Sequence, residues 1–102
     1  MDVNQILKTL DHNLFHDVAV YDVREKTPFY DSVIIATAPS LTQMEAAIRY
    51  LEKDYLIKGI ELASEWTLID LGAVVIHLFS PQDRGKYDLD QILSAYLTMK
   101  RA

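Results

Sequence analysis

The sequence contains no cysteine among its 102 residues and only three glycines and three prolines. Without cysteine, neither a disulfide framework nor a zinc site with thiolate ligands can form. The glycines stand singly, at positions 59, 72 and 85, so no glycine-rich phosphate-binding loop is present. The GxSxG motif that carries the nucleophilic serine of many hydrolases is also missing. These absences remove the commonest signatures of an active site.

Long apolar runs and basic charge are scarce as well. No segment reaches the roughly 18 apolar residues of a membrane-spanning helix, and the start, MDVNQILKTL, lacks the basic region of a secretion signal. The sequence therefore predicts a cytosolic protein that does not act at a membrane. Fifteen acidic and ten basic residues give a net charge of −5. This charge argues against direct binding of RNA or DNA through their phosphates.

The acidic excess is concentrated in the second half of the chain. Between residues 54 and 90 there are seven acidic side chains, Asp54, Glu61, Glu65, Asp70, Asp83, Asp88 and Asp90. The same stretch has three basic side chains, Lys58, Arg84 and Lys86. Such a stretch would attract a basic protein partner. An acidic balance also keeps a small protein soluble, so composition alone leaves both interpretations open.

Two helices are predicted from apolar residues that recur at helical spacing. The first covers residues 3–13 and begins after Asp2, which is suited to the N-cap position. The second covers about residues 41–57 and follows Ser40, which forms a capping-box pattern with Gln43. Gly59 is expected to end this second helix.

Four β-strands are predicted from β-branched and alternating runs. Residues 17–23 and 32–38 form the first two, and the second of these runs is apolar on both faces, as in a central strand. Residues 66–71 and 73–79 alternate on either side of Gly72 and predict an antiparallel hairpin.

The end of the chain is predicted to form a polar loop, SPQDRGK, and then a final helix. The apolar side of that helix would carry Leu89, Ile92, Leu93, Tyr96 and Leu97. The order of elements is therefore helix, strand, strand, helix, strand, strand, helix. This order predicts a single α/β domain over residues 1–102, with a mixed β-sheet and flanking helices.

The predicted hairpin contains a tryptophan, an aspartate and a histidine within an otherwise apolar run. If Leu71 and Gly72 form a two-residue turn, Trp66 lies opposite His77. One face of the hairpin then holds Trp66, Leu68, Asp70, Val75, His77 and Phe79. The other face is aliphatic enough to lie under helices. Tryptophan and histidine together are typical of a surface that is partly apolar yet offers hydrogen-bond donors, and the alternative is a buried pair satisfied within the fold.

Two further patterns favour an ordinary structural role over metal binding. His12 and His16 have the i, i+4 spacing of a helical metal site, but the glutamate of the zinc-protease motif is missing and the helix is expected to end there. Asp88 and Asp90 could hold a divalent cation, but at i, i+2 on a helix they would not face each other. We therefore predict no metal, no cofactor and no catalytic residues.

The second half of the chain resembles the ribosomal silencing factor family, also called RsfS or Iojap. Its signature is a tryptophan, a hydrophobic pair and an aspartate, then a glycine, a hydrophobic run and a histidine, and later R-x-x-Y-x-L-E. The matching positions are Trp66, Asp70, Gly72, His77, Arg84, Tyr87, Leu89 and Asp90. Further upstream, Asp22, Asp31 and Ser40 also match, so the resemblance covers nearly the whole chain.

The sequence departs from the family pattern at a few positions. Only residues 60–65 separate the long helix from Trp66, where the family has a longer segment, so a strand of the relatives is expected to be short or missing. Asp90 stands where the family has glutamate, and Leu93 where it usually has tryptophan.

The resemblance implies a nucleotidyltransferase-like fold that lacks the catalytic carboxylates of that superfamily. It implies a protein that is not an enzyme and has no small-molecule substrate. Its partner would be the large ribosomal subunit, bound through ribosomal protein number fourteen. Binding would block joining of the small subunit and repress translation when nutrients are short.

The resemblance also indicates which residues bind the partner. They are Trp66, Leu68, Asp70, His77, Arg84 and Tyr87. One alternative is a magnesium-dependent nucleotidyltransferase-like enzyme that uses Asp22, Asp70 or Asp88. Another is a homodimeric scaffold in which the face with Trp66 and His77 is buried between two copies.

Overall fold

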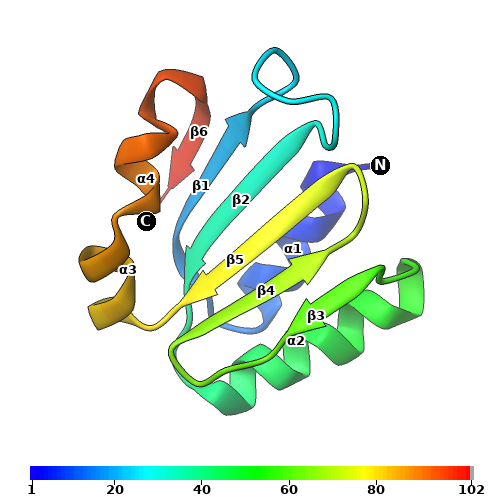
Figure 1. Ribbon diagram of the computed structural model, residues 1–102. Helices are drawn as coiled ribbons and strands as arrows, with labels where there is room; N and C mark the ends of the chain where they lie inside the picture. The colour runs from blue at the N-terminus through cyan, green and yellow to red at the C-terminus, as the bar shows by residue number, and fades with distance from the viewer. Residues whose placement is uncertain (102) are drawn as a thin grey trace.

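A six-stranded β-sheet organises the chain, with the strands in the order β3-β4-β5-β2-β1-β6 (Figure 1). The computed structural model describes residues 1–101. The strands are β1 (His16–Asp22), β2 (Ser32–Thr37), β3 (Gly59–Glu61), β4 (Trp66–Asp70), β5 (Val74–Phe79) and β6 (Leu97–Arg101). Strands β2 and β5 run parallel, and the other neighbouring pairs run antiparallel. The prediction of an α/β domain with a mixed sheet is confirmed.

Two helices, α1 (Val3–His12) and α2 (Leu41–Asp54), lie behind the sheet in Figure 1 and cover one of its faces. Both predicted N-caps are present, because Asp2 accepts a hydrogen bond from the Asn4 N–H (2.9 Å) and Ser40 accepts one from the Gln43 N–H (3.2 Å). Apolar residues of these helices and of the sheet face beneath them form the larger core. Among residues 1–101, no helix is long and apolar enough to cross a membrane.

The second helix is shorter than predicted and does not end at a glycine. It stops at Asp54, because Tyr55 already has extended backbone angles (φ −133°, ψ 146°). Gly59 instead begins β3, an exposed strand of three residues at the edge of the sheet. The expectation that this strand would be short or missing is thus met by a short strand.

The opposite face of the sheet is covered over only part of its width. A smaller core forms there from Ala19, Tyr21, Val23, Val33, Ile35, Phe79 and Leu93. It lies beneath a chain segment made of α3 (Pro81–Tyr87), α4 (Leu89–Ile92) and a 3-10 turn, η1 (Ser94–Tyr96). This segment lies on the β1 side of the sheet in Figure 1, so β3, β4 and much of β5 have no helix over them.

The β4–β5 hairpin has the predicted faces but a different turn. Gly72 and Ala73 form the turn, since the Leu71 N–H donates to the Val74 carbonyl (2.9 Å). Gly72 has φ +93°, a conformation that glycine adopts without the strain of a side chain. Trp66 therefore lies opposite Phe79, and the predicted pairing of Trp66 with His77 is wrong. The register differs by two residues, which preserves the alternation of side chains and hence both faces.

The predicted loop at 80–86 and the predicted long final helix are both wrong. Ser80 caps α3 by accepting the Asp83 N–H (3.2 Å), and Pro81 occupies its first turn. This is a strong local start signal, but the helix buries none of its residues and so shows no apolar periodicity. Beyond it, helix α4 has a single turn and the chain from Leu97 pairs with β1. That pairing joins residues far apart in the sequence, which helical spacing cannot reveal.

Candidate functional site

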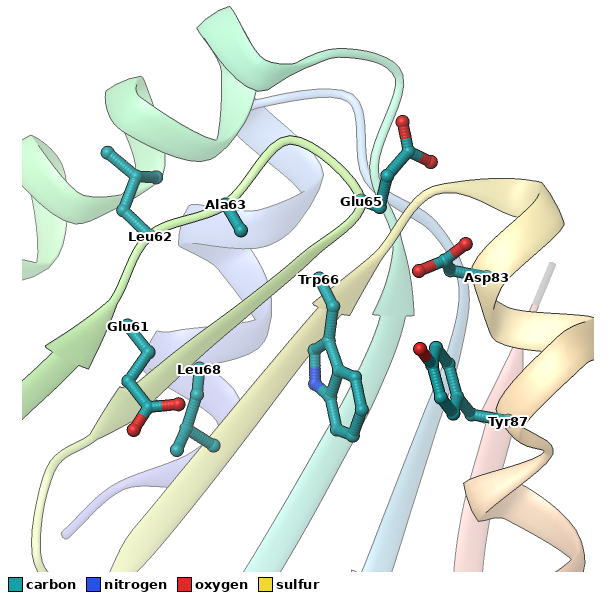
Figure 2. Close-up of a pocket in the computed structure, with 8 residues that line it drawn as sticks. All are labelled: Glu61, Leu62, Ala63, Glu65, Trp66, Leu68, Asp83 and Tyr87. Carbon is teal, nitrogen blue, oxygen red and sulfur yellow. The ribbon is translucent and has the colours of Figure 1, made fainter.

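An acidic groove lies on the open part of the sheet face, between β4, the segment before it and α3 (Figure 2). Its volume is about 360 Å³. Apolar and aromatic side chains line it, namely Leu62, Ala63, Trp66, Leu68 and Tyr87. Its charged lining consists of Glu61, Glu65 and Asp83, and no basic side chain of residues 1–101 lines it. We call these eight residues the acidic groove.

Aromatic rings from separate elements pack together along one side of this groove. The ring centroid of Trp66 lies 4.9 Å from that of Tyr87 and 4.8 Å from that of Phe79. Figure 2 shows the indole of Trp66 and the phenol of Tyr87 side by side, below the carboxylates of Glu65 and Asp83. Tyr87 is 48% exposed and Trp66 is partly buried, while Phe79 is fully buried beneath them. The result is an aromatic surface that is held in place from below yet open to a partner.

The Trp66 indole N–H fixes the tautomer of His77. Nε1 of Trp66 lies 3.0 Å from Nδ1 of His77, and an indole nitrogen can only donate. Nδ1 of His77 is therefore the acceptor, and the proton of the neutral ring is on Nε2. Burial lowers the pKa of His77 to about 4, so the ring is neutral at neutral pH. The predicted association of Trp66 and His77 is real, although they are diagonal neighbours and not an opposed pair.

We expect His77 to make the stability of the protein depend on pH between about 4 and 6.5. Its ordinary pKa is 6.5 and its pKa in the folded protein is about 4. Between these values the unfolded chain binds a proton that the folded chain does not, so stability falls as pH falls. His77→Gln should flatten this dependence when urea denaturation is measured across the range. The same measurement on His16→Gln, which changes an exposed histidine in β1, controls for the substitution itself.

The open face continues beyond the acidic groove from Leu68, at the edge of the groove, to Asp70. Asp70 Oδ1 accepts a hydrogen bond from the Gly72 N–H (2.8 Å), so this carboxylate holds the hairpin turn. Both residues line a second hollow with His77 and Lys58. Leu68 lines both hollows and therefore joins them. The structure thus brings together five of the six predicted site residues, Trp66, Leu68, Asp70, His77 and Tyr87, on one continuous surface.

Arg84, the sixth predicted site residue, is committed to contacts within the protein. Its Nε and Nη2 donate to the two carboxylate oxygens of Asp90, each at 3.0 Å. Its Nη1 donates to the Thr37 hydroxyl (3.0 Å) and to the Asp17 carbonyl. The Arg84 side chain is only 13% exposed. Arg84 therefore ties α3 and α4 to the ends of β1 and β2.

Tyr21 completes this network and was not found by sequence reasoning. Its hydroxyl donates to Asp90 (2.6 Å). Tyr21 ends a continuous apolar run in β1, which gave no sign of a polar role. Burial works to raise the pKa of Asp90, but hydrogen bonds from Arg84 and Tyr21 outweigh it and hold that pKa below its ordinary value. Burial, followed by the Asp90 hydrogen bond, raises the pKa of Tyr21. Asp90 is thus an ionised acceptor shared by two donors.

The alternative of a magnesium-dependent enzyme rests on three aspartates, and in the structure each of them has different surroundings. Asp22 forms a bidentate pair with Arg24 beside the end of β1, and Asp70 holds the hairpin turn. Asp88 lies between α3 and α4 with φ +48° and makes no side-chain cap. Within the described residues, no three histidine, aspartate or glutamate side chains are grouped to hold a metal ion. His12, from the i, i+4 pair, packs edge-on against Tyr50 of α2.

Comparisons with known proteins agree on one family. The family model described as ribosomal silencing factor during starvation matches residues 2–96. Ribosomal silencing factor RsfS of Treponema pallidum is 34% identical over 83 residues, which cover 74% of this chain and 75% of that protein. The mouse protein named mitochondrial assembly of ribosomal large subunit protein 1 is 26% identical over 102 residues, covering 89% of this chain and 44% of that protein. A crystal structure of a Chromobacterium violaceum protein superposes with a TM-score of 0.79 at 27% identity, covering 92% of this chain and 88% of that one.

Proposed function

This chain belongs to the ribosomal silencing factor family, and from that premise we propose that it binds the large ribosomal subunit through ribosomal protein number fourteen. Bound there, it would block joining of the small subunit by occupying the space that the small subunit needs. Such steric action requires no catalytic residue, cofactor or metal. Repression of translation under nutrient limitation would follow from the loss of joined ribosomes.

The acidic groove is the observation that supports this proposal most directly. Three carboxylates surround an apolar and aromatic floor, and no basic side chain within residues 1–101 lines the groove to offset them. A surface of this kind is complementary to a basic protein that presents an apolar side chain between lysines or arginines. Aromatic residues that are held rigidly and partly exposed are also the commonest energetic anchors of protein interfaces.

In this proposal the six predicted residues have two different roles. Trp66, Leu68 and Tyr87 provide the apolar contact, and Asp70 and His77 extend it along β4 and β5. Arg84 contributes indirectly, because its side chain is 13% exposed and four of its five N–H donors are bound within the protein. It acts as a positioning residue that holds α3 in place, so that Tyr87 stays against Trp66.

Co-sedimentation with purified ribosomal subunits tests the proposal. The protein should pellet with large subunits and not with small ones, and binding should weaken as salt rises because charge contributes to it. Glu65→Lys reverses a charge in the groove and should weaken binding. Glu45→Lys makes the same change on the exposed side of α2 and should not. Equal binding to both subunits, or equal effects of the two variants, would contradict the proposal.

We expect Tyr87→Ala to weaken binding by about 2 kcal/mol, or roughly 30-fold, as for other aromatic anchors. The substitution removes the exposed ring that packs on Trp66, while the backbone of α3 keeps its Arg84 contacts. Titration of labelled protein with large subunits measures the effect. Tyr50→Ala is the matched control, because Tyr50 is a similarly exposed tyrosine on α2, on the other face of the sheet. A variant that unfolds more easily but binds normally when folded would show that Tyr87 has only a structural role.

A further inference from the structure

A separate apolar pocket lies on the same sheet face, on the far side of His77 from the acidic groove. It has a volume of about 340 Å³ and lies between residues 24–31 and α4. Val23, Val33 and Leu93 line it and are each buried, with exposed fractions of 1%, 3% and 6%. The sheet and the α4 segment therefore provide an interior that is already formed and apolar.

Two nitrogen donors stand at this pocket, beside the hydroxyl groups of Thr27 and Tyr30, which can donate or accept. His77 lines it, and because Nδ1 accepts the Trp66 indole N–H, the ring can offer only Nε2–H. Lys26 also lines it, with Nζ 5.7 Å from the centroid of the Tyr96 ring, and the lysine is exposed. Among the described residues, no aspartate or glutamate lines the pocket. With two nitrogen donors, one of them charged, and no carboxylate, the polar lining favours an acceptor that carries negative charge.

These features are those of a small-ligand site. Such sites have volumes of roughly 300–1,000 Å³, a mostly apolar lining and a few polar groups that fix the orientation of the ligand. The acidic groove has a different character, because its charged residues are all carboxylates. The two hollows therefore differ in the charge that they accept, although both lie on the same sheet face.

We propose that this pocket binds a small carboxylate with an apolar body, such as a short or medium-chain aliphatic acid. The body of the ligand would pack against Val23, Val33 and Leu93. Its carboxylate would accept a hydrogen bond from Nε2–H of His77 and pair with the ammonium group of Lys26. The proposal concerns the isolated protein and does not depend on ribosome binding.

Nuclear magnetic resonance with octanoate as the probe tests this site on the full chain. We expect saturable shifts of the methyl signals of Val23, Val33, Leu89 and Leu93, with a dissociation constant on the order of 0.1–1 mM for a ligand of this size. Octylamine, which has the same body and the opposite charge, should bind at least about tenfold more weakly. Neither ligand should move the signals of Leu62, which lines the acidic groove.

Lys26→Met separates the contribution of charge from that of apolar contact. Lys26 is exposed, so the variant should fold normally. It should weaken octanoate binding by about fivefold or more and leave the binding of uncharged 1-octanol unchanged. Absence of saturation by octanoate, shifts located elsewhere, or equal binding of octanoate and octylamine would overturn the proposal.

Discussion

Arg84→Met should lower the free energy of unfolding by about 3 kcal/mol or more, the lower end of the range for breaking a buried ion pair. The methionine keeps the aliphatic volume of the side chain but leaves the Asp90 carboxylate without its bidentate partner. Asp90 retains one hydrogen bond, from Tyr21, and its side chain is 27% exposed, so water can partly replace the guanidinium. These two features place the expected loss at the lower end. Urea denaturation of the wild type and the variant measures it.

The pair formed by Arg24 and Asp22 offers a matched control for this result. It is also bidentate, but the two side chains are 68% and 35% exposed. Arg24→Met should therefore change stability little, because exposed pairs are screened by water and salt. Equal losses in the two variants would show that burial does not set the strength of the Arg84 pair. A stable Arg84→Met variant that keeps Tyr87 packed on Trp66, as judged by the fluorescence of Trp66, and still fails to bind ribosomes would show that Arg84 contacts the partner directly.

Trp66→Ala should weaken docking to the large subunit by about 2 kcal/mol or more, a loss of roughly 30-fold in affinity. The indole forms the centre of the aromatic surface, where it contacts Tyr87 and Phe79 and also donates to His77. Since Trp66 is only partly buried, the same change should cost less stability than the roughly 3–5 kcal/mol found for fully buried aromatic residues. Binding titrations at matched folded concentration, together with urea denaturation, separate the two effects.

A double-mutant cycle with His77→Gln shows whether Trp66 and His77 act as a unit in docking. Their side chains are joined by a hydrogen bond of 3.0 Å, so the loss of either one disturbs the other. Residues in contact usually show a coupling of about 0.5 kcal/mol or more. Additive losses of binding energy would mean that the two side chains contribute to docking independently.

The faces of the sheet could be predicted from the sequence because they depend on local alternation. A strand has a side-chain period of two, so Trp66 and His77 share a face whichever even register the hairpin adopts. The helix starts at Asp2 and Ser40 were also predictable, since capping is a contact between residues two or three apart. The resemblance to the family then showed that this face carries residues of the family signature. The alternation of side chains alone could not show this.

The full surroundings of Arg84 could not be predicted from local pattern, because two of its three partners lie in distant parts of the chain. Asp17 and Thr37 come from the first two strands, and they meet Arg84 only after β1 and β2 pair and α3 packs beside them. Strand β6 could not be predicted for a similar reason. Leu97 fits the spacing of a helix as well as that of a strand. Only its pairing with Tyr21 of β1, which makes β6 the edge strand of the sheet, decides between them.

Subunit joining on sucrose gradients tests the central claim most directly. Purified large subunits are first incubated with a saturating amount of the protein, and small subunits are then added. We predict that the wild type sharply reduces the fraction of joined ribosomes, and that Tyr87→Ala and Trp66→Ala at the same concentration reduce it much less. Tyr50→Ala, on the opposite face, should act like the wild type. Normal joining by large subunits that carry the bound wild-type protein would contradict the account.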